Sequence, residues 1–219
     1  MRKSFFLAYV AMLLASCSTQ TLVPQFALTA VSNGYGTDTE NIVNSTIART
    51  QTKRVIGGEI YQYEEEIEVY SHDEVTHEYT CDEFQIKWMI DRTRLNFDLL
   101  NTSGDNLRII WQEAIIVDVD DYAYRVYHEH MKYIDRLPFT PDMIVPDGAR
   151  CKDFVVPIGN AVWTGNNYHE LPLVARAQLK RNETIKVILP IEAYGRRMDY
   201  TFTFTITDIK VQKTKMSLF

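Results

Sequence analysis

Two histidines lie two residues apart in the middle of the chain. His128 and His130 flank Glu129 in a stretch with strand character, so both imidazoles would point to one face and the carboxylate to the other. Two imidazoles on one face could bind a metal ion such as zinc. No third ligand can be identified, and two histidines at a solvated strand end account for the pattern. We therefore expect no metal site and no cofactor.

Two further clusters combine titratable side chains. The first contains His72, Asp73 and His77, and the second contains Asp118, Asp120 and Asp121. The histidine cluster again lacks a complete set of ligands. The aspartates lack the glycine and the distal glutamate of a calcium loop, and aspartate is common in hairpin turns. We assign no metal to either cluster.

Nucleophilic catalysis has no motif in this chain. There is no G-x-S-x-G pentapeptide, and no serine lies in a recognisable activating setting. Paired carboxylates could still hydrolyse a glycan, because the 29 acidic residues are abundant and their separation in space cannot be read from the sequence. We expect a protein that is not an enzyme, with a glycan hydrolase of the cell envelope as the alternative.

The segment 157–172, here called the ligand loop, is the best candidate for a binding surface. It contains Trp163, Asn166, Tyr168 and His169 between two prolines. Aromatic rings can stack on a sugar or a peptide while amides supply hydrogen bonds. The alternative is an aromatic side chain that folds back to close the end of the domain, as many loop aromatics do.

The start of the chain has the order of a lipoprotein leader. The basic residues Arg2 and Lys3 precede an apolar run at 5–14, and small residues lead to Cys17. The pattern resembles the lipobox of bacterial lipoproteins, which implies cleavage after residue 16 and acylation of Cys17. The alternatives are an ordinary secretory signal and a short transmembrane anchor. The apolar run is shorter than the roughly 20 residues that span a bilayer.

Two cysteines would remain beside the lipidated one. Cys81 and Cys151 would lie in a compartment that allows disulfides. If paired, they would close a long loop and stabilise the fold by about 4 to 5 kcal/mol on the chain-entropy model. The alternative is two buried free thiols that act as small apolar side chains. Two cysteines carry no spacing pattern that decides between these states.

The elements that position these residues are predicted to be strands. Apolar and polar residues alternate at 84–90, at 95–101 and most cleanly at 198–206. No helix of more than three turns can be identified. Many short strands predict a sandwich or a barrel, and we favour an all-β sandwich. The expected division is a signal peptide at 1–16, a lipidated tether at 17–54 with room for one early strand, and a β-sandwich domain at 55–219.

A resemblance covers roughly residues 95–157 of this domain. It is carried by Phe97 to Asn101, Ile109 to Trp111, Ala114 to Asp118, Tyr124 to Val126, and the Pro146-Asp147-Gly148 turn. This order of turn and core residues resembles a group of uncharacterised bacterial lipoproteins with an immunoglobulin-like β-sandwich. The resemblance implies a fold, and no catalytic residue comes with it.

Charge and export signal narrow the function further. The net charge of −6 becomes −8 without Arg2 and Lys3, and an acidic protein repels phosphate backbones, so nucleic-acid binding is not expected. Ser18 after the cysteine favours the bacterial outer membrane, on either its periplasmic or its surface face. We expect a lipid-anchored, non-enzymatic module that recognises another envelope protein or a glycan.

Overall fold

The computed structural model describes residues 18–55, 66–129, 131, 141–163 and 168–215. Cys17 and the expected leader at 1–16 lie outside these residues. The strands are β1 (Ser18–Asn33), β2 (Gly36–Asp38), β3 (Ile42–Val55), β4 (Glu66–Thr80), β5 (Phe84–Ile90), β6 (Leu95–Asn101), β7 (Leu107–Ile109), β8 (Ile115–Val117), β9 (Ala123–Tyr127), β10 (Met143–Val145), β11 (Arg150–Pro157), β12 (Ala161–Trp163), β13 (Tyr168–Glu170), β14 (Thr184–Ala193) and β15 (Arg196–Lys215). Single-turn 3-10 helices are η1 (Trp111–Glu113), η3 (Ile158–Asn160) and η4 (Arg176–Gln178). The prediction of an all-β fold is confirmed.

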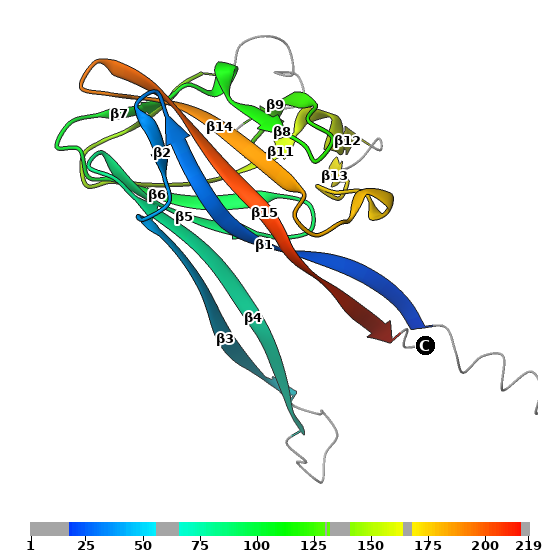
Figure 1. Ribbon diagram of the computed structural model, residues 1–219. Coiled ribbons are helices and arrows are strands. Elements are labelled where there is room, and N and C mark those ends of the chain that lie inside the picture. Colours follow the sequence, from blue (N-terminus) through cyan, green and yellow to red (C-terminus); the bar gives the residue numbers. More distant parts are fainter. Residues whose placement is uncertain (1–17, 56–65, 130, 132–140, 164–167, 216–219) are drawn as a thin grey trace, which may run out of the picture.

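Within the described residues, the main sheet is continuous and antiparallel. Its strand order is β2-β1-β15-β14-β8-β9-β11-β6-β5-β4-β3, with β7 and β10 attached beside β14. The sheet curls so that the layer of β1, β15 and β14 faces the layer of β4, β5 and β6 (Figure 1). Strand β9 joins the layers because it pairs with β8 on one side and with the end of β11 on the other.

Aromatic side chains fill the space between the two layers. The Trp88 ring of β5 lies 5.2 Å from the Phe202 ring and 5.4 Å from the Phe204 ring of β15. All three side chains are completely buried. These contacts join strands that are far apart along the sheet path, so burial of aromatic surface keeps the sheet curled.

The predicted alternation is confirmed where one face of a strand meets this core. In β15 the buried residues Tyr200, Phe202, Phe204 and Ile206 alternate with partly exposed neighbours. The same period of two is found in β5 and β6. A two-residue turn, Tyr194 and Gly195, joins β14 to β15, and both residues have positive φ, as this hairpin geometry requires.

The segment expected as a tether is mostly strand. Residues 18–55 form β1, β2 and β3, and β1 pairs with β15 from Ser18 to Ser32. Register shifts at Gln25/Phe26 and Leu28/Ala30 interrupt the period of two, although Phe26, Leu28 and Val31 are buried. The prediction allowed one early strand in this tether, whereas the structure has three; the partner strand is far away in sequence and the bulges hide the pattern.

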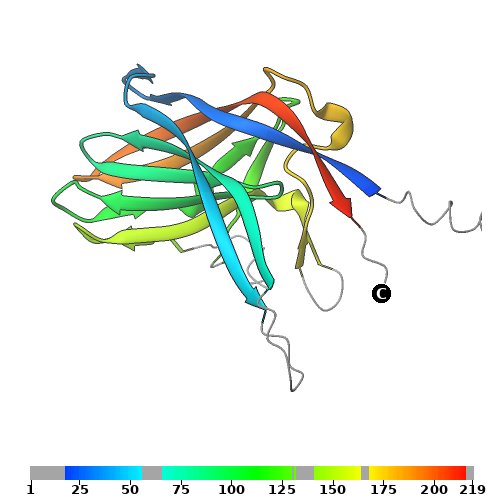
Figure 2. The same cartoon turned by 90° about the horizontal axis from the view of Figure 1, so that it is seen from below.

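The two facing layers and the core between them are here called the body. Two pairs of strands extend beyond it as ribbons. The β3–β4 ribbon consists of 45–55 paired with 66–76, and the β1–β15 ribbon consists of 18–26 paired with 206–215. Figures 1 and 2 show both ribbons leaving the body toward the same side. The chain enters the β1–β15 ribbon at Ser18, directly after Cys17.

Two features of the C-terminal third depart from regular strand pairing. Residues 173–180 form no strand and contain η4. At Pro190 the neighbour of β14 changes, because β14 pairs with β8 at 186–188 and with β7 at 191–192. A proline lacks an N–H, so it fits between these two partners. Among the described residues, no helix is long and apolar enough to cross a membrane.

Candidate functional site

A histidine and an aspartate form a buried pair where β9 meets β11. His128 Nδ1 lies 3.1 Å from Asp153 Oδ2, and the two side chains are almost completely buried. The imidazole stacks on the Trp111 indole, with 4.1 Å between ring centroids and 8° between planes. Asp153 Oδ1 accepts hydrogen bonds from the backbone N–H groups of Glu129 and Phe154. The pair therefore fixes the junction of the two layers from inside the core.

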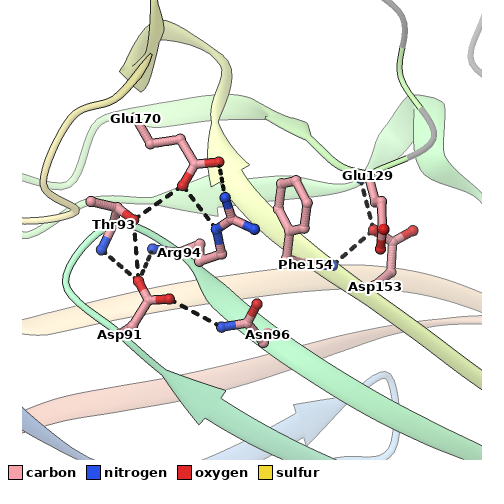
Figure 3. A network of polar contacts seen from close by, with 8 residues as sticks. All are labelled: Asp91, Thr93, Arg94, Asn96, Glu129, Asp153, Phe154 and Glu170. Carbon is pink, nitrogen blue, oxygen red and sulfur yellow. Dashed lines mark hydrogen bonds and ion pairs between the residues drawn. The ribbon is translucent and has the colours of Figure 1, made fainter. Parts of the chain in front are cut away.

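A second polar cluster lies on the other side of Phe154 (Figure 3). Arg94 donates two hydrogen bonds to Glu170, with Nε 2.8 Å from Oε2 and Nη2 2.6 Å from Oε1. The guanidinium carbon lies 4.3 Å from the centroid of the Phe154 ring. Thr93 adds a hydroxyl that donates to Glu170 Oε2. Such bidentate, charge-assisted pairs are geometrically specific, and we call this cluster the hairpin clamp.

The clamp begins at a preorganised turn. Asp91 Oδ1 accepts hydrogen bonds from the backbone N–H groups of Thr93 and Arg94 at 2.8 and 2.9 Å. The carboxylate thereby closes the β5–β6 turn and orients Arg94 toward Glu170, as aspartate does in Asx turns. Asn96 donates to the other Asp91 oxygen at 3.3 Å.

The hairpin clamp holds the ligand loop. Instead of an irregular loop, 157–172 contains η3 and a hairpin of β12 and β13, with Glu170 at the end of β13. Asn160 Nδ2 donates to the Pro172 carbonyl, and the Leu173 N–H donates to the Arg92 carbonyl. The base of the hairpin is thus attached to the β5–β6 turn.

A small apolar cluster supports the same hairpin. It consists of Tyr127, Met131, Phe154, Val156 and Ala161, all buried. Phe154 of β11 belongs to both the apolar cluster and the clamp, so this one residue connects the two sets of contacts. The hairpin base is therefore built as a fixed platform, as a rigid scaffold positions a binding loop.

The structure describes the four predicted ligand-loop residues to different extents. Trp163 and Tyr168 face each other in the β12–β13 register, although their side chains lie outside the described part of the structure. His169 is exposed opposite Val162. Asn166 lies outside the described residues. Sequence reasoning missed Arg94 and Glu170, because a salt bridge between residues so far apart in sequence has no local signal.

The remaining histidines do not assemble a metal site in the described residues. No group of three or more His, Cys, Asp or Glu side chains is close enough there to hold a metal ion. His130 and the side chains of His72 and Asp73 lie outside the described part. Asp118 Oδ1 accepts hydrogen bonds from the N–H groups of Asp120 and Tyr122, so it shapes the β8–β9 turn, as the turn interpretation requires.

His77 belongs to a polar seam between β3 and β1, formed by Leu28, Asn44 and His77. The Asn44 amide accepts from the Leu28 N–H and donates to the Leu28 carbonyl, both at 3.0 Å. His77 Nδ1 lies 2.6 Å from Asn44 Oδ1. Because that oxygen only accepts, Nδ1 carries the proton and donates. Burial lowers the pKa of His77 to about 4, so the imidazole is neutral near pH 7.

Cys81 and Cys151 are free thiols in the structure. Cys151 pairs in register with Leu99, Leu99 with Ile86, and Ile86 with Tyr79, two residues before Cys81. Three strand spacings of about 4.8 Å separate the thiols by roughly 14 Å or more. A disulfide needs Cα atoms less than about 7 Å apart, so the structure has the free-thiol alternative. Burial raises the pKa of each thiol to about 12.

The outer face of β4, β5, β6 and β11 carries a groove of about 450 Å³ with two carboxylates. Glu78 lies 2.7 Å from Lys87, and Asp98 lies 2.9 Å from Arg150. Each acid is therefore paired with a base, which is not the arrangement of two carboxylates facing a sugar.

Comparison with known proteins adds nothing to these features. No protein-family model, no curated protein and no solved structure matches this chain. The functional argument therefore rests on the geometry of the fold, its ribbons and its grooves.

Proposed function

We propose that this chain is a lipid-anchored, non-enzymatic module of the bacterial outer membrane that binds another envelope protein along its β3–β4 ribbon. The leader 1–16 is removed and Cys17 is acylated in this proposal. The observation that supports protein binding is the open backbone of the ribbon.

The ribbon has hydrogen-bonding edges that no described strand covers. β3 is the last strand of the sheet path and pairs only with β4. β4 pairs with β5 at His77–Thr80 alone, so among the described strands only β3 pairs with 66–76. A two-stranded ribbon is marginally stable in water by itself. An exposed edge is a template for an added strand, which is a common mode of peptide recognition.

The second ribbon supplies a spacer between the membrane and the body. Strand β1 starts at Ser18, so an acyl chain on Cys17 would be attached at the tip of the β1–β15 ribbon. Three strand residues, 18–20, precede Thr21, where the ribbon meets the body, and they extend over about 10 Å. The body would stand off the membrane on a paired ribbon instead of a flexible tether.

The proposal keeps one feature of the immunoglobulin-like sandwich, which is its two facing layers. Two layers of strands face each other across one core, and the resemblance at 95–157 falls within β6 to β11. The connection of the layers through β9 differs from two separate sheets.

Photo-crosslinking in intact cells tests the binding edge. A photoreactive amino acid at Thr50 or Thr52 is expected to give one adduct of defined mass, whereas the same amino acid at Lys186, on the β14 side of the body, gives none. Adducts from Lys186 equal to those from the ribbon, or none from any position, would contradict the proposal.

A variant with a shortened β3–β4 ribbon tests whether the ribbon is needed for partner binding. Replacing 49–72 by Asn-Gly connects Ala48 to Asp73, which already pair in register, through a favourable two-residue turn. This variant is expected to keep its melting temperature and to lose the partner. An unchanged yield of partner in co-purification would refute binding by the ribbon.

A further inference from the structure

A small groove lies where the β1–β15 ribbon meets the body. It has a volume of about 140 Å³ and is bordered by Thr21 of β1, by Arg92 of the β5–β6 turn and by Arg176 of η4. Leu22, Val174 and Leu179 supply an apolar wall. Among the side chains that the structure describes, no acidic one lines it.

Neither arginine of the groove has a carboxylate partner among the described residues. Five other arginines of the described residues form ion pairs with acids: Arg94, Arg108, Arg150, Arg181 and Arg197. Arg92 and Arg176 form none with any residue of the described part, and both are exposed. Two guanidinium groups that share one groove repel each other unless an anion lies between them.

Hydrogen bonds fix the backbone under both arginines. The Arg92 carbonyl accepts from the Leu173 N–H at 3.0 Å, and the neighbouring Asp91 carboxylate closes the turn. Two residues after Arg176, the Gln178 side chain donates to Asp120 in the β8–β9 turn. Val174 is buried in the main core. The side of the groove that carries Arg92 and Arg176 is therefore part of the rigid body, and β1 of the ribbon forms the other side.

We propose that this groove binds a phosphate group, with the two guanidiniums and the Thr21 hydroxyl as donors. Guanidinium groups match phosphate oxygens in charge and in bidentate geometry. The apolar wall suits a phosphate ester whose alkyl part lies along Leu22 and Leu179. A phosphodiester headgroup of a membrane lipid and a free phosphate share this chemistry.

The position of the groove favours a lipid headgroup as the source. Thr21 is four residues after Cys17, which is at most about 14 Å along an extended chain. Acylation of Cys17 would therefore bring the groove within reach of headgroups. This step rests on the lipid anchor of the proposed function, whereas phosphate binding itself does not.

Isothermal titration calorimetry on the full chain in a non-ionic detergent separates the two sources. The probes are inorganic phosphate, glycerophosphoglycerol and dihexanoyl-phosphatidylglycerol. A lipid site binds dihexanoyl-phosphatidylglycerol at least about tenfold more tightly than inorganic phosphate, because the alkyl part adds apolar contact. Equal affinity for all three probes indicates a site for free phosphate.

The double variant Arg92→Gln/Arg176→Gln is expected to bind about 100-fold more weakly, since each charge-assisted hydrogen bond accounts for roughly tenfold. The control Arg125→Gln/Arg196→Gln removes two exposed arginines that lack ion pairs in the described residues and do not line the groove. It is expected to change affinity less than about twofold.

No saturable binding of any probe, or equal losses in both double variants, would overturn the phosphate site. Each variant is first checked for an unchanged melting temperature. Intact mass of the purified chain reports acylation separately, and crosslinking reports the partner, so failure of either leaves the titration result interpretable.

Discussion

The polar seam predicts that acid weakens the fold through one histidine. His77 is buried and its pKa falls from 6.5 to about 4. Between these values the unfolded chain binds more protons than the folded one, so stability is lost as pH falls through this window. The difference between a pKa of 6.5 and one of about 4 corresponds to roughly 3 kcal/mol of stability at its limit.

The variant His77→Asn removes the titration and keeps a donor. An asparagine amide can replace Nδ1 as donor to Asn44 Oδ1, although the edge contact of the imidazole with Phe204 is lost. The free energy of unfolding is measured by urea denaturation at about pH 7 and about pH 4.5. Wild type is expected to lose about 2 kcal/mol more than the variant over this interval. Other titrating groups are common to both proteins and cancel in the difference.

Equal losses in the two proteins, within about 0.5 kcal/mol, would refute the seam as a neutral hydrogen-bonded site. A lower stability of His77→Asn at pH 7 would not by itself refute the seam, because the lost packing on Phe204 lowers the stability at both pH values.

Three further predictions concern the core, the hairpin clamp and the thiols. Trp88→Ala is expected to cost about 3 to 5 kcal/mol in urea denaturation, since the indole is fully buried among aromatic rings; a cost below about 1 kcal/mol would contradict the packing described. Glu170→Ala leaves Arg94 unpaired and should speed proteolysis within 157–172 while the core keeps its protection from hydrogen exchange; uniform loss of protection would argue against a local clamp. Cys81 and Cys151 should both react with a thiol reagent in urea without reductant and react slowly in the native state, because burial raises their pKa to about 12; no reaction in urea would indicate a disulfide.

The sequence predicted the strands whose alternation meets the core without interruption. Trp88, Phe97 and Phe202 are buried as their spacing implied. The β1 strand could not be predicted in the same way, because its bulges shift Phe26 and Val31 out of a single period. Its partner β15 lies at the other end of the chain, and local pattern carries no information about such pairing.

Candidate sites were less predictable than strands. The aromatic residues at 157–172 suggested a binding loop, which stays a prediction, and the clamp that holds this segment depends on Arg94 and Glu170, which meet only after the sheet has curled. The phosphate groove likewise joins Thr21, Arg92 and Arg176 from three separate parts of the chain. Spacing rules find sites built within one element, and these sites are built between elements.

The central claim is that the β3–β4 ribbon receives a strand from a partner protein. Hydrogen–deuterium exchange of the protein in native envelope vesicles, from the cells that express it, tests it most directly, with the purified protein in vesicles of extracted lipid as reference. The account predicts that amides of 45–55 exchange more slowly in the native vesicles, whereas those of 18–26 do not differ. Equal exchange of 45–55 in both preparations would contradict it.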